Sequence, residues 1–148
     1  MSNGKEFTIV RDFDASPDLI WKAWTSADDV VAWWHPRNVS VDPASVSMDA
    51  REGGSYAYTM VRDADGEQFP NEGVFLELDE PRRLKFTWGN PGDAEDDIAV
   101  ITVLLEPFDA GTRMTFHLDG ESGTPGGGGI HDGWDQAFDV LGELLARS

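Results

Sequence analysis

The sequence predicts an α+β fold, in which an opening strand, two short helices and six strands are followed by a long C-terminal helix. Between about residues 39 and 118, apolar and polar side chains alternate with a period of two, which is typical of half-buried strands. Helix-start signals precede this run, and residues 130–145 repeat apolar side chains at helical spacing. Turn residues separate the predicted strands, so an antiparallel meander with one covered face is the simplest arrangement.

The first strand is predicted over residues 5–14, KEFTIVRDFD, where apolar residues occupy both alternating faces. Residues 16–25, SPDLIWKAWT, follow as a short helix. Ser16 is the expected N-cap and Pro17 takes the first helical position, which together satisfy or remove amide donors that lack partners at a helix start.

A second short helix is predicted over residues 26–34, SADDVVAWW. Ser26 is its expected cap, and Asp29 stands in the position that Glu usually holds in a capping box. The helix should stop at Pro36, because the residue before a proline is pushed away from helical angles.

The strands that follow are separated by turn residues such as Gly53-Gly54, Asp65-Gly66 and Asn90-Pro91-Gly92. Each strand has one strongly apolar face, as the alternation of Leu84, Phe86 and Trp88 illustrates. The predicted strands are residues 45–50, 55–62, 73–79, 83–88, 98–106 and 112–118.

A glycine-rich connector, residues 120–129, leads into the last helix, for which Asp132 is the expected N-cap. No internal repeat or interdomain linker is visible, so residues 1–148 are expected to form one domain. The apolar stripe of the helix consists of Ile130, Trp134, Phe138, Leu141 and Leu145.

The composition excludes several classes of function. A formal charge of −17 repels phosphates, so nucleic acid and anionic membranes are poor partners. There are no cysteines, which excludes disulfides, zinc-thiolate sites and thiol nucleophiles. With no apolar run near ~20 residues and no signal-peptide layout at the start, a soluble cytoplasmic protein without membrane insertion is expected. The acidity fits either a surface adapted for solubility, as in a saline cytoplasm, or docking to a basic partner.

Five segments carry a resemblance to a known family: FDASPDLIWKAWTSADDVVAWWHP, REGGSYAYTM, EGVFLELDEPRRLKFTW, GTRMTFHLDG and GWDQAFDVLGELLA. In this order, over nearly the whole chain, they resemble the family named after the activator of the heat-shock-protein-90 ATPase, within the START and birch-pollen-allergen superfamily. The resemblance implies a helix-grip fold, with a curved antiparallel sheet of six to seven strands around the long C-terminal helix and a cavity between them. Members of the superfamily include co-chaperone domains, lipid and hormone binders and polyketide cyclases, so the resemblance identifies a scaffold more firmly than a function.

Adjacent tryptophans, Trp33 and Trp34, close the second predicted helix. Neighbouring side chains on a helix point about 100° apart, so the two rings cannot share one face. Each indole can bury about 150–250 Å². We expect one ring to enter the core and the other to lean toward the cavity mouth, and the alternative is that both serve packing alone.

Aromatic and thioether side chains are expected to line the cavity. Such walls suit a flat or apolar small molecule, and the alternative is a core that these side chains fill completely. The candidate ligand-binding residues are Trp33, Trp34, Tyr56, Tyr58, Met60, Phe75, Phe86, Trp88, Met114, Phe116, Trp134 and Phe138.

Neither a metal site nor a cofactor is expected. His131 and Asp135 share a helix face, but with only His35 and His117 as further histidines there is no dense ligand motif. No serine stands in a nucleophile elbow, and no catalytic residue is assigned. General acid–base chemistry stays open without a choice among its candidates, which are His35, Glu52, Tyr56, Tyr58 and Glu72.

The leading hypothesis is therefore binding of a hydrophobic or aromatic, lipid-like small molecule between the sheet and the C-terminal helix. The first alternative is a stress-related interaction module that docks on a chaperone or another basic surface. The second is a cyclase or dehydratase. The sequence specifies neither the ligand nor the oligomeric state.

Overall fold

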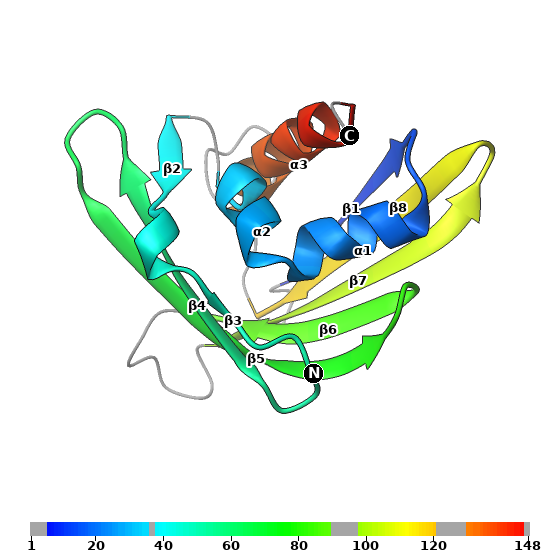
Figure 1. Ribbon diagram of the computed structural model, residues 1–148, viewed down its shortest axis with the longest axis horizontal. Helices are drawn as coiled ribbons and strands as arrows, with labels where there is room; N and C mark the ends of the chain where they lie inside the picture. Colours follow the sequence, from blue (N-terminus) through cyan, green and yellow to red (C-terminus); the bar gives the residue numbers. More distant parts are fainter. Residues whose placement is uncertain (1–5, 36–37, 90–97, 121–129, 147–148) are drawn as a thin grey trace.

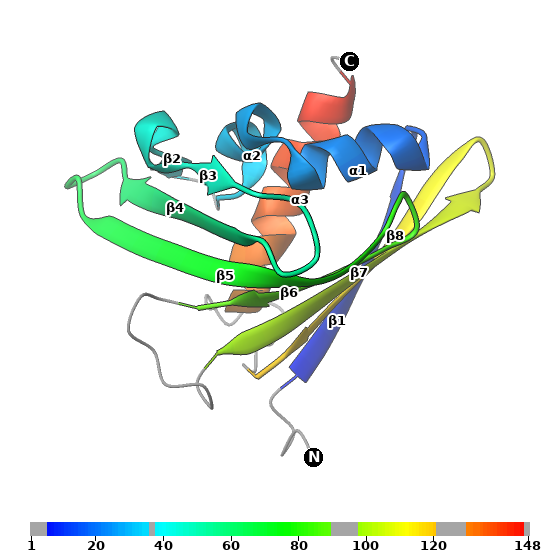
Figure 2. The same cartoon turned by 60° about the horizontal axis from the view of Figure 1, so that its bottom comes forward.

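One strongly curved antiparallel sheet holds three helices against its concave face (Figures 1 and 2). The computed structural model describes residues 6–35, 38–89, 98–120 and 130–146. The helices are α1 (Pro17–Thr25), α2 (Ala27–Trp33) and α3 (Ile130–Ala146). The strands are β1 (Glu6–Phe13), β2 (Val39–Val41), β3 (Ser47–Met48), β4 (Ser55–Arg62), β5 (Gln68–Asp79), β6 (Arg83–Trp88), β7 (Ala99–Phe108) and β8 (Gly111–Asp119).

Among the described residues, seven strands follow one another across the sheet in the order β1-β8-β7-β6-β5-β4-β2, and β3 pairs with β4 beside this path. Every pairing is antiparallel. The long helix α3 crosses the concave face, and α1 and α2 cover the same face beside it (Figure 2). The predicted α+β fold, with a curved sheet around the last helix and two short helices after the first strand, is confirmed.

The prediction was wrong about the chain between the second helix and β4. Val39–Val41 forms the short strand β2, which was not predicted as a strand of its own. The predicted strand over residues 45–50 is reduced to the two residues of β3, because the 3₁₀ turn η1 (Pro43–Ser45) takes its start. The carboxylate of Asp42 accepts the backbone N–H of Ala44 at 3.1 Å, and Pro43 suits the first position of such a turn.

Strand β5 begins at Gln68, five residues before the predicted start at Gly73. Pro70 argues against a strand from sequence alone, because proline cannot donate to the ladder. In the structure Pro70 lies opposite Thr59 of β4. The backbone N–H and carbonyl of Thr59 point away from β5, toward the Ser45 hydroxyl and the Asp42 N–H, so the ladder with β4 needs no donor from Pro70.

The two predicted helix caps behave differently. Ser16 accepts the N–H of Leu19 at 3.3 Å, which confirms the first cap. Ser26 occupies the N-cap position of α2, as predicted, but its side chain makes no cap hydrogen bond. Ser26 also ends α1, where its N–H binds the carbonyl of Lys22 at 2.9 Å, and Asp29 lies 3.5 Å from the Lys22 ammonium instead of completing a capping box.

Helix α3 starts at Ile130, so Asp132 lies in its first turn and is not the N-cap that the sequence predicted. Helix α2 ends at Trp33. The predicted stop at Pro36, the turn around Pro91 and almost all of the glycine-rich connector lie outside the described residues.

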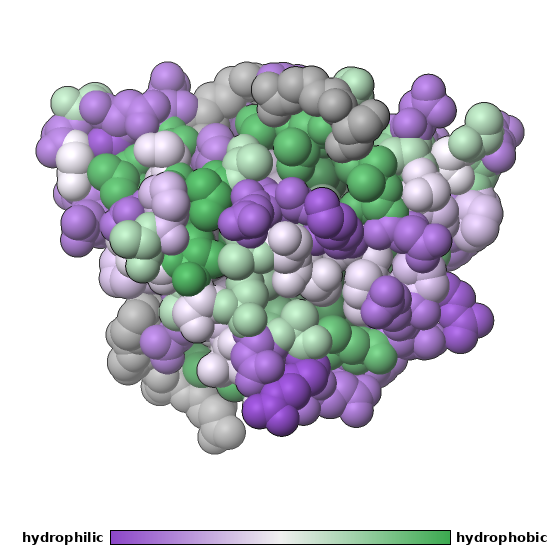
Figure 3. All heavy atoms as spheres, viewed as in Figure 1, coloured by the Kyte–Doolittle hydropathy of each residue, from purple (hydrophilic) through white to green (hydrophobic). Residues whose placement is uncertain are grey.

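The surface mixes polar and apolar areas. On the face seen in Figure 3, hydrophilic residues surround several separate apolar areas instead of leaving one large apolar patch. No helix in the described part of the chain is long and apolar enough to cross a bilayer.

Candidate functional site

A cluster of aromatic rings fills the space in which the sheet meets the helices. Trp24 of α1 lies at its centre, with its ring centroid 4.6 Å from that of Trp33 in an edge-to-face contact. It also stacks on Phe116 of β8 and Trp134 of α3, with centroid distances of 6.2 and 6.0 Å. We call the following residues the aromatic cluster: Trp24, Trp33, Trp34, Tyr56, Tyr58, Phe75, Phe86, Trp88, Phe116, Trp134 and Phe138.

Trp33 and Trp34 contact different neighbours, as expected for adjacent residues at a helix end. Trp33 packs on Trp24, and its indole N–H donates to the carbonyl of Ala23 at 2.8 Å. Trp34 faces the sheet, edge-on to Tyr58 at 5.2 Å and stacked on Phe86 at 5.8 Å. Both rings are buried, with 0% and 2% of their surface exposed. The two tryptophans therefore contact different partners, but neither leans out toward solvent.

The predicted ligand-binding residues do gather on the concave side, where they pack against one another. Most of them expose between 0% and 6% of their surface, so other protein atoms surround their side chains on nearly all sides. The exceptions are Met60 of β4 and Trp88 of β6, which are half-buried. Among the predicted site residues, Met60 and Trp88 therefore keep the most surface that a ligand could reach.

Three hydrogen-bond donors in this cluster are unused. The indole N–H groups of Trp24 and Trp34 are buried without an acceptor among the described residues. The hydroxyl of Tyr58 accepts the Trp88 indole N–H at 2.9 Å, but its own proton has no acceptor in the described part of the chain. Burial raises the pKa of Tyr58 far above its ordinary value, so this hydroxyl stays a neutral donor.

Of the acid–base candidates, Tyr56 and Tyr58 stack on each other with ring centroids 6.2 Å apart, and Glu52 and His35 have other neighbours. Burial raises the pKa of Tyr56, and its electrostatic interactions with Tyr58 and Glu72 raise it further, so neither buried tyrosine is a base near neutral pH. The carboxylate of Glu52 lies at the N–H of Leu78, at 3.5 Å, and the His35 ring lies 3.2 Å from the carbonyl of Ala32.

The histidine and aspartate that share a face of α3 have separate neighbours. The ring of His131 packs on Phe7 at 5.2 Å. The carboxylate of Asp135 pairs with the Arg11 guanidinium at 3.0 Å. Within the described ranges, no three His, Asp or Glu side chains lie close enough together to hold a metal ion.

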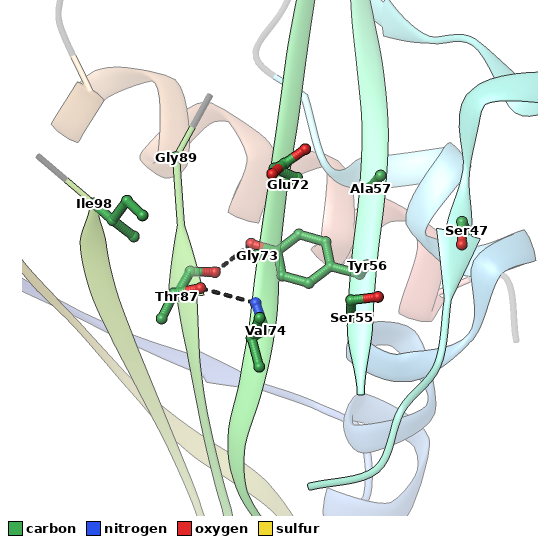
Figure 4. A pocket seen from close by; sticks show the side chains of 10 residues that line it. All are labelled: Ser47, Ser55, Tyr56, Ala57, Glu72, Gly73, Val74, Thr87, Gly89 and Ile98. Carbon is green, nitrogen blue, oxygen red and sulfur yellow. Dashed lines mark hydrogen bonds between the residues drawn. The ribbon is translucent and has the colours of Figure 1, made fainter. Parts of the chain in front are cut away.

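A recess of about 300 Å³ lies on the other face of the sheet (Figure 4). Successive side chains of a strand point to opposite faces, and Ser55 and Ala57 flank the inward-pointing Tyr56, while Glu72 and Val74 flank Gly73. These four residues therefore face the convex side, away from the aromatic cluster. The recess, as we use the term below, is lined by Ser47, Ser55, Tyr56, Ala57, Glu72, Gly73, Val74, Thr87, Gly89 and Ile98.

Under the recess, the ladder between β5 and β6 is broken. Glu72 and Gly89 exchange backbone hydrogen bonds, so Val74 and Thr87 would form the next such pair. Instead, the N–H of Val74 donates to the side-chain hydroxyl of Thr87 at 2.8 Å, and the Thr87 carbonyl accepts the hydroxyl of Tyr56 at 2.6 Å (Figure 4). Two side chains thus replace backbone partners.

Only glycine fits at position 73 in this arrangement. A Cβ atom on Gly73 would lie 2.0 Å from the carbonyl oxygen of Thr87 and 2.6 Å from a ring carbon of Tyr56. The missing side chain lets Tyr56 reach across β5 to β6, so Tyr56 contacts both the aromatic cluster and the recess.

The sequence did not identify Trp24, Gly73 or Thr87 as site residues. Trp24 was predicted as part of the apolar stripe of the first helix. It was not included in the cavity wall, because all the predicted wall residues came from the second helix, the sheet and the last helix. Gly73 marked the start of a predicted strand, although a glycine inside a strand pattern signals close approach of another backbone. No sequence signal distinguishes Thr87 from any other threonine of a strand.

A curved antiparallel sheet that holds a C-terminal helix defines the helix-grip class of proteins. Residues 14–146 match the family model described as "Activator of Hsp90 ATPase homolog 1-like protein". The chain therefore belongs to this family, as the resemblance in its sequence indicated.

Solved structures share this fold. Protein CV1439 from Chromobacterium violaceum is 22% identical and has a TM-score of 0.83, covering 95% of this chain and 96% of its own. Protein NE0264 from Nitrosomonas europaea is 27% identical with a TM-score of 0.79, covering 99% and 97%. An AHSA1-like protein from Aeromonas hydrophila is 19% identical with a TM-score of 0.78, covering 96% and 92%. A comparison with curated proteins gives no match.

Proposed function

We propose that the protein binds an apolar or aromatic small molecule between the concave face of the sheet and α3. The observation that carries this proposal is the set of unused donors in the aromatic cluster, namely the indole N–H groups of Trp24 and Trp34 and the hydroxyl proton of Tyr58. A ligand with an aromatic or apolar framework and one hydrogen-bond acceptor could pack on these rings and accept from one of the unused donors.

Unused buried donors are costly, which is the physical reason to expect a guest. Leaving a buried donor unpaired costs about 1–3 kcal/mol, and native proteins contain few such groups. Trp34 lies edge-on to Tyr56 and Tyr58, and contact between an N–H group and an aromatic ring recovers only part of that cost. An acceptor from a ligand would recover more.

The two half-buried residues among the predicted site residues, Met60 and Trp88, mark the proposed entry. Trp88 contacts the hydroxyl of Tyr58 and the ring of Trp134. The flexible Met60 side chain can change rotamer at little cost. Entry of a ligand requires Met60 and Trp88 to move, since the rings behind them are almost fully buried.

A neutral fluorophore with a ketone acceptor, 6-propionyl-2-dimethylaminonaphthalene, tests the proposal. Titration of the ¹⁵N-labelled protein should give saturable binding and should shift the indole N–H signal of Trp34. In the Tyr58→Phe variant, the loss of one hydrogen bond of about 1 kcal/mol should weaken binding by about fivefold.

Val10→Thr is the matched control, because Val10 is an apolar side chain that is 52% exposed on the convex face. This variant should bind the fluorophore like the unchanged protein. The proposal fails if no saturable binding occurs, or if binding leaves all indole signals in place and is lost in Val10→Thr.

Docking on a chaperone is a second candidate function, supported by the family's description and by the charge of −17. An acidic surface steers basic partners toward it, and salt weakens such complexes. A purified heat-shock-protein-90 chaperone should then be retained by the immobilised protein at low salt and released as the salt concentration rises. Retention of no chaperone at low salt would remove this candidate.

A further inference from the structure

The recess on the convex face has a polar and acidic half. The carboxylate of Glu72 has neither a hydrogen bond nor an ion pair with any described residue, and the hydroxyls of Ser47 and Ser55 also lack partners in the described part of the chain. None of the residues that line the recess is basic. This half therefore offers acceptors and one uncompensated negative charge.

The other half is apolar. Ala57, Val74 and Ile98 line it, and Val74 keeps 40% of its surface exposed although it is a strand residue. An apolar wall beside a few polar groups is the usual composition of a small-molecule site, and a volume of about 300 Å³ lies at the lower end of the range for such sites.

The floor of the recess is held in place by side chains. At the broken ladder, Thr87 is fixed on both its hydroxyl and its carbonyl, by the N–H of Val74 and by the hydroxyl of Tyr56. Gly73 and Gly89 have no side chains that would project from the floor into the recess. The depression is therefore part of the fold, and it exists before a ligand arrives.

We propose that this recess binds a small organic ammonium ion that carries a short aromatic or apolar group. The ammonium would lie at the Glu72 carboxylate, with the hydroxyls of Ser47 and Ser55 as further acceptors, and the apolar group would cover Val74 and Ile98. The net charge of −17 concentrates cations near the surface and repels carboxylate or phosphate ligands of the same size. This site is separate from the proposed concave site, and Tyr56 is the residue that both share.

Benzylammonium is a suitable probe, and its neutral and anionic analogues, benzyl alcohol and benzoate, have nearly the same shape. Titration followed by NMR should shift the backbone amide signals of Gly73, Val74 and Gly89 with benzylammonium. Affinity in the millimolar range is expected for so small a ligand, on the order of 1 mM by the usual limit on binding energy per atom. Benzyl alcohol should bind at least tenfold more weakly and benzoate not at all.

Two variants separate a specific site from general attraction of cations. Glu72→Gln removes the charge in the recess and should weaken benzylammonium binding at least tenfold. Glu106→Gln removes one charge from an exposed strand position outside the recess and should change the affinity less than twofold.

The proposal is overturned if benzyl alcohol binds as tightly as benzylammonium, if both variants weaken binding equally, or if the shifts fall elsewhere on the sheet. The indole N–H signal of Trp34 should not move with benzylammonium, which distinguishes this site from the concave one.

Discussion

The two halves of the sheet are built differently. In the half formed by β1, β8 and β7, pairing is continuous, from Glu6 opposite Asp119 to Phe13 opposite Thr112 and along β7 from Val100 to Phe108. In the half formed by β4, β5 and β6, the register shifts between Phe75 and Glu77, and the ladder breaks at Val74 and Thr87. We call these the continuous half and the interrupted half.

The features that we assign to function lie in the interrupted half. In the continuous half, backbone groups pair with each other, and side chains are free to pack, as the fully buried Met114 does. In the interrupted half, the side chains of Tyr56 and Thr87 serve as partners for the backbone. The half-buried Met60 and Trp88 and the recess lie in that same half. Irregular pairing of this kind is common next to functional sites in sheets.

The largest expected effect compares one methionine from each half. Met114→Ala should lower the free energy of unfolding by about 2–5 kcal/mol, because a fully buried side chain leaves a cavity in packed surroundings. Met60→Ala should cost only about 1 kcal/mol, since Met60 is half-buried and water can enter. Urea unfolding of both variants measures the difference, and equal losses would show that the two halves are packed alike.

A smaller effect is expected for Gly73→Ala, which places a Cβ atom 2.0 Å from the Thr87 carbonyl oxygen. Strands β5 and β6 must then move apart, at a cost of about 1–3 kcal/mol. Thermal and urea unfolding provide the measurement.

Gly142→Ala in α3 is the matched control for that substitution. Its Cβ atom would meet only the Phe13 ring at 3.6 Å, an ordinary contact, and alanine favours a helix by about 0.5–1 kcal/mol over glycine. The control should therefore be neutral or stabilising. If Gly73→Ala behaves in the same way, the close approach at the broken ladder is not a constraint on the fold.

A smaller effect again is expected for Tyr56→Phe, which removes the donor to the Thr87 carbonyl and should lower the free energy of unfolding by about 1–2 kcal/mol. Tyr58→Phe should cost less, because Trp88, whose indole N–H donates to the Tyr58 hydroxyl, is half-buried. Hydrogen exchange of the Val74 amide should also speed up in Tyr56→Phe and stay unchanged in Tyr58→Phe. Equal exchange in both variants would mean that Tyr56 does not hold the interrupted half together.

The periodic spacing of apolar residues in the sequence was enough to predict most of the strands and helices. The alternation in β4, β6 and β8 and the stripe of α3 each mark a buried face, because burial of one face requires that spacing. The start of β5 and the reduction of the predicted strand at 45–50 were missed, since pairing with β4 and the turn at Pro43 overrode local preference. Of the predicted site residues, all were placed on the concave side, but their role in binding stays a prediction.

The sequence by itself determined which residues turn inward, because spacing along a strand or helix fixes the direction of each side chain. It also determined the charge that any ligand or partner meets. Only the tertiary structure decided how closely the inward rings pack, that Trp24 lies among them, and that Gly73 lets Tyr56 reach Thr87. Such contacts join residues far apart in the chain, and their distances depend on how the strands and helices approach one another in space, which no local pattern encodes.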